Sequence, residues 1–149
     1  IGDAKWYLGG SSTYNNVTPP MFYQRERGTT VYSGRSTNWT GKVGLMYPSD
    51  YGYATSGGTT INRTSCMTKE LYNWDNYSDC KNNGWISAWQ LTMSSRADTS
   101  NNVFFVTGTG YINFSNANGN SEAHPVVHLK STIKVISGTG SSTDPFVLS

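Results

Sequence analysis

The chain has 149 residues and a formal net charge of +2, and only 13% of its residues are charged. Its length suits one domain with its own core, and an aromatic content of 13% is too high for a disordered chain. The weak charge, without a Lys/Arg cluster, excludes a nucleic-acid-binding surface. No apolar run reaches the roughly 18 residues that a membrane-spanning helix needs. We therefore expect residues 1–149 to form a single folded domain with an uncharged polar surface.

The first half of the chain predicts one strand and two short helices. The apolar run KVGLMYP, which begins at Lys42, is typical of a short buried strand. Pro48–Ala54 predicts a helix, because proline suits the first helical position. Thr64–Tyr72 predicts a second helix, because it begins with residues that can cap a helix, and Met67 and Leu71 lie one turn apart.

The second half predicts strands. WISAWQLTMS begins at Trp85, and NVFFVTG and GYINFSN flank Gly108–Gly110, which indicates a hairpin. PVVHLKSTIKVISG, from Pro125, is either one long strand or two, and DPFVLS forms a last strand after a turn at Asp144. The expected fold class is α+β, with many short antiparallel strands, one or two short helices and long loops.

Cys66 and Cys80 are the only cysteines. Their spacing suits a local disulfide, which would stabilise the fold by about 3 kcal/mol in the chain-entropy model. A disulfide implies an oxidising, extracellular setting. The alternative is a pair of free, buried thiols in a cytosolic protein.

The predicted hairpin has two different faces. Alternation along a strand places Ile112 and Phe114 on a core face, and Tyr111, Asn113 and Ser115 on the opposite face. Tyr, Ser, Gly and Asn are enriched in antibody binding surfaces, because they combine contact area with adaptable hydrogen bonds. This favours a binding surface, and the alternative is a polar face that only meets water. The loop at 92–102 is expected near the same end of the hairpin.

Arg96 adds a planar donor fork that can hold an acceptor with two hydrogen bonds. The predicted ligand-binding surface comprises the polar and aromatic residues of both segments, namely Ser94, Ser95, Arg96, Asp98, Asn101, Asn102, Tyr111, Asn113, Ser115, Asn116, Asn118 and Asn120.

Catalytic and metal-binding motifs do not stand out. His124 and His128 lie four residues apart without a Gly-x-Ser-x-Gly motif, and no pair of acidic residues forms a recognisable glycosidase motif. GTGSSTDP lacks the lysine and the following helix of a phosphate-binding loop. YNWDNYSD is rich in oxygen ligands but lacks the spacing of a calcium-binding loop. We expect no metal, no cofactor and no enzymatic activity.

Several segments occur in an order that resembles a known family. They are WYLGG at Trp6, FYQRERGTTVYSGR from Phe22, WTGKVGLMYPSDYGYAT from Trp39, WQLT at Trp89, and HPVVHLKSTIKVISGTGSSTDPFVL from His124. This order resembles the C-terminal domain of Gram-positive bacterial surface proteins, many of which carry a prepilin-like N-terminal segment. The resemblance covers nearly the whole chain.

The resemblance implies a C-type-lectin-like fold of the formylglycine-generating-enzyme type, which is shared with variable proteins of diversity-generating retroelements and with some phage receptor-binding tips. In such proteins the ligand-facing residues would correspond here to Ser94–Glu122. The chain departs from the family where Glu122-Ala123-His124-Pro125 replaces Gly-Val-Arg-Pro. The copper-binding cysteines of the enzyme and the calcium-binding triplets of lectins are not recognisable, so neither property is carried over.

The resemblance implies an extracellular adhesion domain, at the tip of a bacterial pilin-like surface protein, that binds a cell-surface protein or glycan. Neither nucleic-acid binding nor insertion of the domain into a membrane is expected. The alternatives are a minor pilin that packs against neighbouring pilin subunits, a phage receptor-binding protein on a virion surface, and a carbohydrate-active or protein-modifying enzyme that uses Asp98 or His124.

Overall fold

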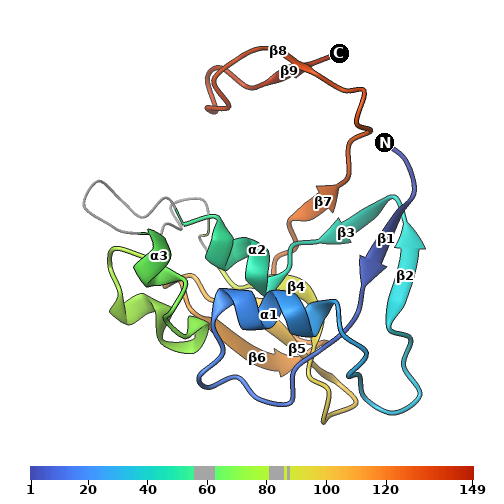
Figure 1. Ribbon diagram of the computed structural model, residues 1–149, viewed down its shortest axis with the longest axis vertical. Helices are drawn as coiled ribbons and strands as arrows, with labels where there is room; N and C mark the ends of the chain where they lie inside the picture. The colour runs from blue at the N-terminus through green and yellow to red at the C-terminus, as the bar shows by residue number, and fades with distance from the viewer. Residues whose placement is uncertain (56–62, 81–85, 87) are drawn as a thin grey trace.

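Short antiparallel strands pair two or three at a time in this chain, and short helices cover one side of them (Figure 1). The structure is a computed structural model of residues 1–149, and it describes residues 1–55, 63–80, 86 and 88–149. The predicted α+β class, with several short antiparallel strands and few short helices, is confirmed.

The central sheet contains β4 (Gln90–Ser95), β5 (Asn102–Val106) and β6 (Ile112–Asn116) in sequential antiparallel order. The predicted hairpin is confirmed, because β5 and β6 pair directly, with Phe105 opposite Asn113. Gly110 closes the turn between them at a φ of +98°, a conformation that favours glycine. The first residues of the predicted WISAWQLTMS strand, 85 and 87, lie outside the described residues.

The helices are α1 (Pro19–Glu26), α2 (Pro48–Tyr53), α3 (Arg63–Cys66) and the 3-10 helix η1 (Leu71–Asn76). The helix expected at 48–54 is confirmed as α2. The helix expected at 64–72 is wrong in extent, because α3 ends at Cys66. The N–H of Leu71 donates to the Val17 carbonyl at 3.0 Å instead of continuing the α-helical hydrogen bonds.

The remaining strands form three separate pairs. They are β1 (Ala4–Tyr7) with β2 (Asn38–Gly41), β3 (Val43–Leu45) with β7 (Pro125–Val127), and β8 (Val135–Ser137) with β9 (Val147–Leu148). The stretch from Pro125 therefore forms two strands.

The strand expected from Lys42 is buried only in part, since Val43 is 47% exposed. Gly44 is buried under Trp6, and a Cβ at this position would come within 2.6 Å of the indole ring. The strand can therefore approach Trp6 only because residue 44 has no side chain.

The core lies between the helices and the inner face of the central sheet. Phe22 of α1 meets Phe104 of β5 edge-to-face, with ring centroids 5.3 Å apart. The residues packed with them include Val17, Met46, Tyr51, Leu71, Trp74, Ile86, Val106 and Ile112. The alternation predicted for β6 is confirmed for its core side: Ile112 is buried, and Phe114 is half-buried against the core.

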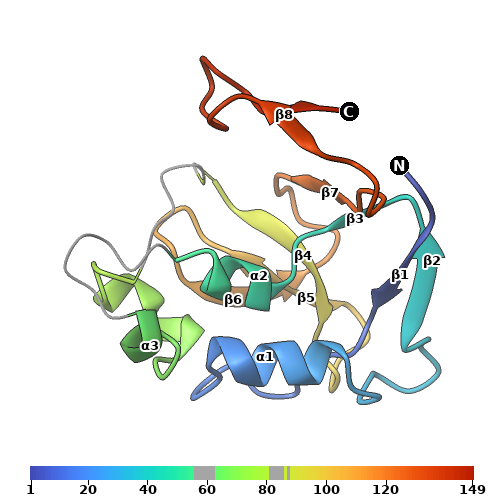
Figure 2. The same ribbon diagram turned by 45° about the horizontal axis from the view of Figure 1, so that its top comes forward.

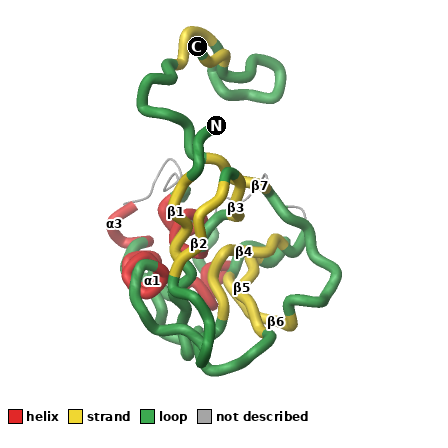
Figure 3. The backbone as a smooth tube through the Cα atoms, turned by 90° about the vertical axis from the view of Figure 1, so that its right-hand side faces the viewer, coloured by secondary structure: helices red, strands yellow, loops and turns green. Residues whose placement is uncertain are grey.

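The C-terminal hairpin of β8 and β9 lies apart from the central sheet and the helices, as Figures 2 and 3 both show. Val135 and Ile136 are 58% and 61% exposed, and Phe146 is 56% exposed. An isolated two-stranded hairpin is only marginally stable in water, so this apolar surface is not explained by packing within the described part of the chain.

The predicted disulfide is confirmed between Cys66 and Cys80, which are both buried. It joins the end of α3 to the segment that follows η1. None of the described helices is both long and apolar enough to cross a membrane.

Reduction of this disulfide should lower the free energy of unfolding by about 3 kcal/mol, because the bond restricts the conformations that the unfolded chain can adopt. Urea unfolding in the presence and absence of a reductant measures this loss. The Cys66→Ala, Cys80→Ala double variant is the control, since its unfolding midpoint should not respond to the reductant. An unchanged midpoint for the native sequence would contradict a stabilising role.

Candidate functional site

Two places in the described structure bring polar, charged and aromatic side chains together. One is a buried carboxyl cluster between α1 and α2, and the other is an open cleft at one end of the central sheet. No group of three or more His, Cys, Asp or Glu residues that could hold a metal ion comes together among the described residues.

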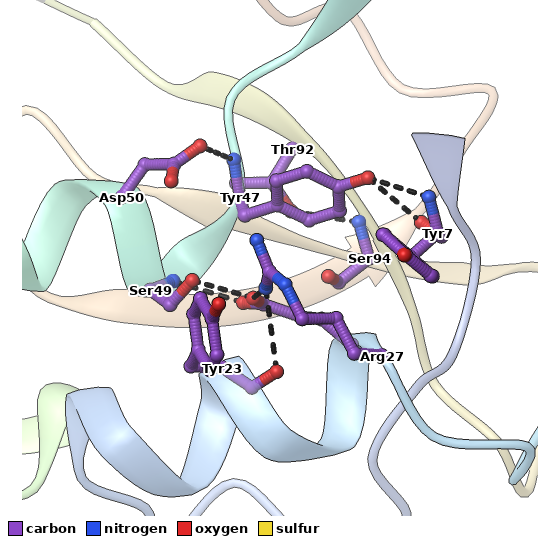
Figure 4. Close-up of polar contacts among 9 residues, drawn as sticks. Tyr7, Tyr23, Arg27, Tyr47, Ser49, Asp50, Thr92 and Ser94 are labelled. Carbon is purple, nitrogen blue, oxygen red and sulfur yellow. Dashed lines mark hydrogen bonds and ion pairs between the residues drawn. The ribbon is translucent and has the colours of Figure 1, made fainter. Parts of the chain in front are cut away.

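The buried cluster is built around Glu26, the last residue of α1, which is 1% exposed. Its Oε1 accepts a hydrogen bond from the Ser49 backbone N–H at 2.9 Å, and its Oε2 accepts one from the Ser49 hydroxyl at 2.5 Å. Arg27 forms an ion pair with the same carboxylate at 3.1 Å (Figure 4). Burial raises the pKa of Glu26 to about 7, although the Ser49 hydrogen bonds oppose that change.

Aromatic rings surround the cation of this cluster. The Arg27 guanidinium lies 3.6 Å from the ring centroid of Tyr23, 5.4 Å from that of Tyr47 and 5.6 Å from that of Tyr7. The Tyr47 hydroxyl accepts a hydrogen bond from the Tyr7 N–H and donates one to the Tyr7 carbonyl. Both the Glu26 carboxylate and the Arg27 guanidinium make their contacts with other groups of the protein. The cluster therefore joins α1, α2 and β1, and we do not assign a ligand to it.

The second place is an open cleft of about 960 Å³. It lies between the start of β4, the turn that joins β5 to β6, and the segment that precedes β7. Its lining residues are Ala88, Trp89, Thr107, Gly108, Thr109, Tyr111, Asn120, Ser121 and Glu122.

Trp89 forms a flat wall of this cleft. Its ring stacks on that of Phe105, with centroids 4.7 Å apart and planes inclined by 13°. Phe105 is 2% exposed, whereas Trp89 is 51% exposed. One face of the indole is therefore held against the sheet, and the other remains open.

Backbone hydrogen bonds hold Glu122 beside Trp89. The Glu122 N–H donates to the Trp89 carbonyl at 2.8 Å, and the Leu91 N–H donates to the Glu122 carbonyl at 2.9 Å. Gln90 and Glu122 form a parallel bridge at this point. The indole and the carboxylate are thus fixed on neighbouring backbone segments.

The Glu122 side chain is exposed, and a hydrogen bond from the buried Gln90 side chain orients it. The Gln90 amide Nε2 donates to Glu122 Oε2 at 2.6 Å, and Gln90 is fully buried. The amide oxygen of Gln90 has no hydrogen-bond partner within the described structure. No basic side chain from the described part of the chain forms an ion pair with Glu122.

The opposite wall of the cleft contains Tyr111 and the hairpin turn. The Tyr51 hydroxyl donates to the Gly110 carbonyl at 2.8 Å and fixes the turn from the core side. Tyr111 donates its N–H to the Thr107 hydroxyl oxygen, and its ring meets Tyr72 edge-to-face at 6.0 Å. Tyr111 is half-buried by these contacts, so both aromatic walls have fixed positions.

The structure separates the predicted ligand-binding residues into two groups. Asn102 pairs with Asn116, and the Ala117 N–H donates to the Asn101 carbonyl, so the loop at 96–102 lies beside the end of β6 as expected. Tyr111 and Asn120 instead line the cleft near the other end of the hairpin. Ser115, Asn118 and the amides near them are exposed.

Some of the predicted residues make their polar contacts within the protein. Arg96 is 8% exposed; its guanidinium donates to the Asp98 carboxylate and to the Ser12 carbonyl, and lies 4.2 Å from the centroid of the Phe114 ring. The Arg96 hydrogen bond lowers the pKa of Asp98. Ser94 is buried, Ser95 is half-buried, and the Asn113 side-chain oxygen accepts the Phe114 N–H. Ligand contact by any of these residues stays a prediction.

The sequence indicates Trp89 only as an apolar residue of a strand. Glu122 is the last residue of the interval 94–122 that the family resemblance implies to face a ligand, but it is not among the individual residues predicted for the site. Neither histidine lines the cleft: His128 contacts the Trp6 ring, with ring centroids 4.7 Å apart, and His124 is exposed beside β7.

No protein-family model, curated protein or solved structure matches this chain.

The raised pKa of Glu26 predicts how stability depends on pH. The unfolded chain releases this proton near pH 4.5, whereas the folded protein holds it up to about pH 7. The folded state therefore binds more protons between these values, and the free energy of unfolding falls as pH rises through them, by up to about 3 kcal/mol. Urea unfolding of the native protein and Glu26→Gln at several pH values measures the fall, which the variant should largely lose. An identical fall in both proteins would contradict the assignment to Glu26.

Proposed function

We propose that this chain is an extracellular, non-enzymatic ligand-binding domain with a C-type-lectin-like fold, displayed at the distal end of a pilin-like bacterial surface protein. The observation that carries the proposal is the open cleft with the fixed aromatic walls of Trp89 and Tyr111. The Cys66–Cys80 disulfide supports an oxidising, extracellular setting.

The cleft has the composition of a recognition site. Binding pockets combine apolar and aromatic walls with a few polar groups that fix the orientation of the ligand. Among the described lining residues, the polar groups are hydroxyls, an amide and one carboxylate around the rim. Because the stacked Trp89 is already oriented, binding does not have to order that ring, and this reduces the entropic cost of association.

Reversible binding fits the arrangement of carboxylates better than glycoside hydrolysis does. That reaction generally uses two carboxyl groups that flank the scissile bond, about 5–9.5 Å apart. Among the described residues that line the cleft, Glu122 supplies the one carboxylate. Asp98, a catalytic candidate in the enzymatic alternative, lies in the loop between β4 and β5 and accepts hydrogen bonds from Arg96.

The Trp89→Ala variant should abolish specific adhesion while the domain remains folded, because it removes the open aromatic wall. The measurement is binding of the domain to glycan arrays and to intact bacterial and host cells, together with the melting temperature. Trp39→Ala is the matched control, since Trp39 is 47% exposed on β2, outside the cleft.

The Asn113→Ala, Asn116→Ala double variant tests the hairpin face that the sequence predicts as the site. If it abolishes binding and Trp89→Ala does not, the ligand contacts that face and the cleft is not the site. Binding that survives both changes would contradict both sites.

A structural role as an assembly subunit is a second candidate, and the exposed apolar residues of the β8–β9 hairpin favour it. If this hairpin packs against neighbouring subunits, the domain should self-associate at high concentration. Changing Val135 and Ile136 to Thr, which retains strand propensity, should then restore the monomer in analytical ultracentrifugation. A native protein that is monomeric at every concentration would argue against this role. A virion surface would be a different location for the same binding chemistry.

A further inference from the structure

We infer that the ligand of the Trp89–Tyr111 cleft is a carbohydrate that carries a free, positively charged amine, such as a hexosamine that is not acetylated. This inference rests on the proposed function, because it names the ligand class of the same cleft. It depends on three properties of the cleft: an uncompensated carboxylate, an open aromatic platform and a hydroxyl-bearing rim.

The first property is the charge of Glu122. Its carboxylate is exposed at the cleft and is not neutralised by an ion pair with any described basic residue. Among the described residues that line the cleft, none is Lys, Arg or His. A ligand cation placed here would form a charge-assisted hydrogen bond, which is stronger than a hydrogen bond between neutral groups.

The support beneath this carboxylate fixes its position in the cleft. Gln90 is fully buried and donates to Glu122 Oε2 at 2.6 Å, which leaves the Oε1 atom of Glu122 for a ligand. A carboxylate held in this way is already oriented for a ligand, so binding does not have to order its side chain.

The second property is the platform. The open indole face of Trp89 is flat and backed by Phe105 at 4.7 Å. A pyranose ring presents a flat patch of C–H groups that can lie on such a face, because the aromatic face carries negative charge density and the C–H hydrogens are slightly positive. The same face attracts a nearby ammonium group.

The third property, the hydroxyl-bearing rim, favours a sugar ligand over a lysine side chain. Thr109 and Asn120 are exposed on the rim, and Ser121 is half-buried there. Their hydroxyl and amide groups both donate and accept hydrogen bonds, as ring hydroxyls require. A lysine side chain has a flexible aliphatic stem without hydroxyls, and would leave these rim groups without a ligand partner. The cleft therefore matches an amino sugar better than it matches a basic peptide.

The test compares the β-1,4-linked trisaccharide of glucosamine with its fully N-acetylated counterpart. Titrations are followed by calorimetry and by the indole N–H signal of Trp89 in NMR spectra, at about pH 6, where the amine is protonated. The native domain should bind the charged trisaccharide more tightly than the acetylated one. Added salt should weaken the charged complex, because it screens the ion pair.

The decisive variant is Glu122→Gln, which keeps an oxygen for the Gln90 amide but removes the charge. It should weaken binding of the charged trisaccharide by about tenfold, the loss expected for one charge-assisted contact, and leave the acetylated one unaffected. Asp3→Asn removes a carboxylate from the exposed N-terminal segment, outside the cleft. It should change neither affinity.

Three results would overturn the inference. They are equal or tighter binding of the acetylated trisaccharide, no effect of Glu122→Gln, and stronger binding of a lysine-rich peptide than of the charged trisaccharide. In each case the proposed function stands if Trp89→Ala still abolishes adhesion to cells. If adhesion is also independent of Trp89, the proposed site fails with the inference.

Discussion

The buried carboxylate of Glu26 is the contact on which the arrangement of the other elements depends. It ends α1, accepts two hydrogen bonds from Ser49 at the start of α2, and is paired with Arg27. The Glu26 backbone carbonyl also accepts the Gly9 N–H, which brings in the segment after β1. With α1 held in this way, Phe22 packs against Phe104 and fixes the distance between the helices and the central sheet. Removing the Ser49 hydrogen bonds would be destabilising, because the buried carboxyl oxygens of Glu26 would lose hydrogen bonds.

The cleft forms because the central sheet is supported on its inner face and carries polar connections at its ends. Phe104 faces the helices, whereas the neighbouring Phe105 faces away and is covered by Trp89. The turn after β5 is tied to the core through Tyr51, and Glu122 is tied to β4 through backbone hydrogen bonds. The groups available to a ligand are therefore on connecting segments, and a rigid sheet sets their positions, which is the usual arrangement in binding proteins.

Local patterns predicted the parts of this structure that local interactions determine. The β5–β6 hairpin follows from alternation and a glycine turn, α2 from its N-terminal proline, and the disulfide from the close spacing of its cysteines. The helix α1 was missed, because its two prolines and its charged end are typical of a loop, and it is buried only through Phe22 and Glu26, with Pro19 at its start. The cleft was missed for another reason. It depends on a bridge between Gln90 and Glu122, which are 32 positions apart, and no local pattern encodes this contact.

The low charge of the chain allows one carboxylate to influence which ligand the cleft prefers. On a densely charged surface, neighbouring ions of both signs would mask a single acidic group. Here only 13% of residues are charged, and the net charge is +2. Electrostatic influence extends about 8 Å at physiological ionic strength, and the rim residues within the cleft are hydroxyls and amides. Among the described residues that line the cleft, Glu122 is the one that carries a formal charge, and the neutral polar groups beside it offer other cations no second charge. A polar, aromatic and weakly charged surface is thus compatible with selective recognition, because one fixed charge can determine which ligand is preferred.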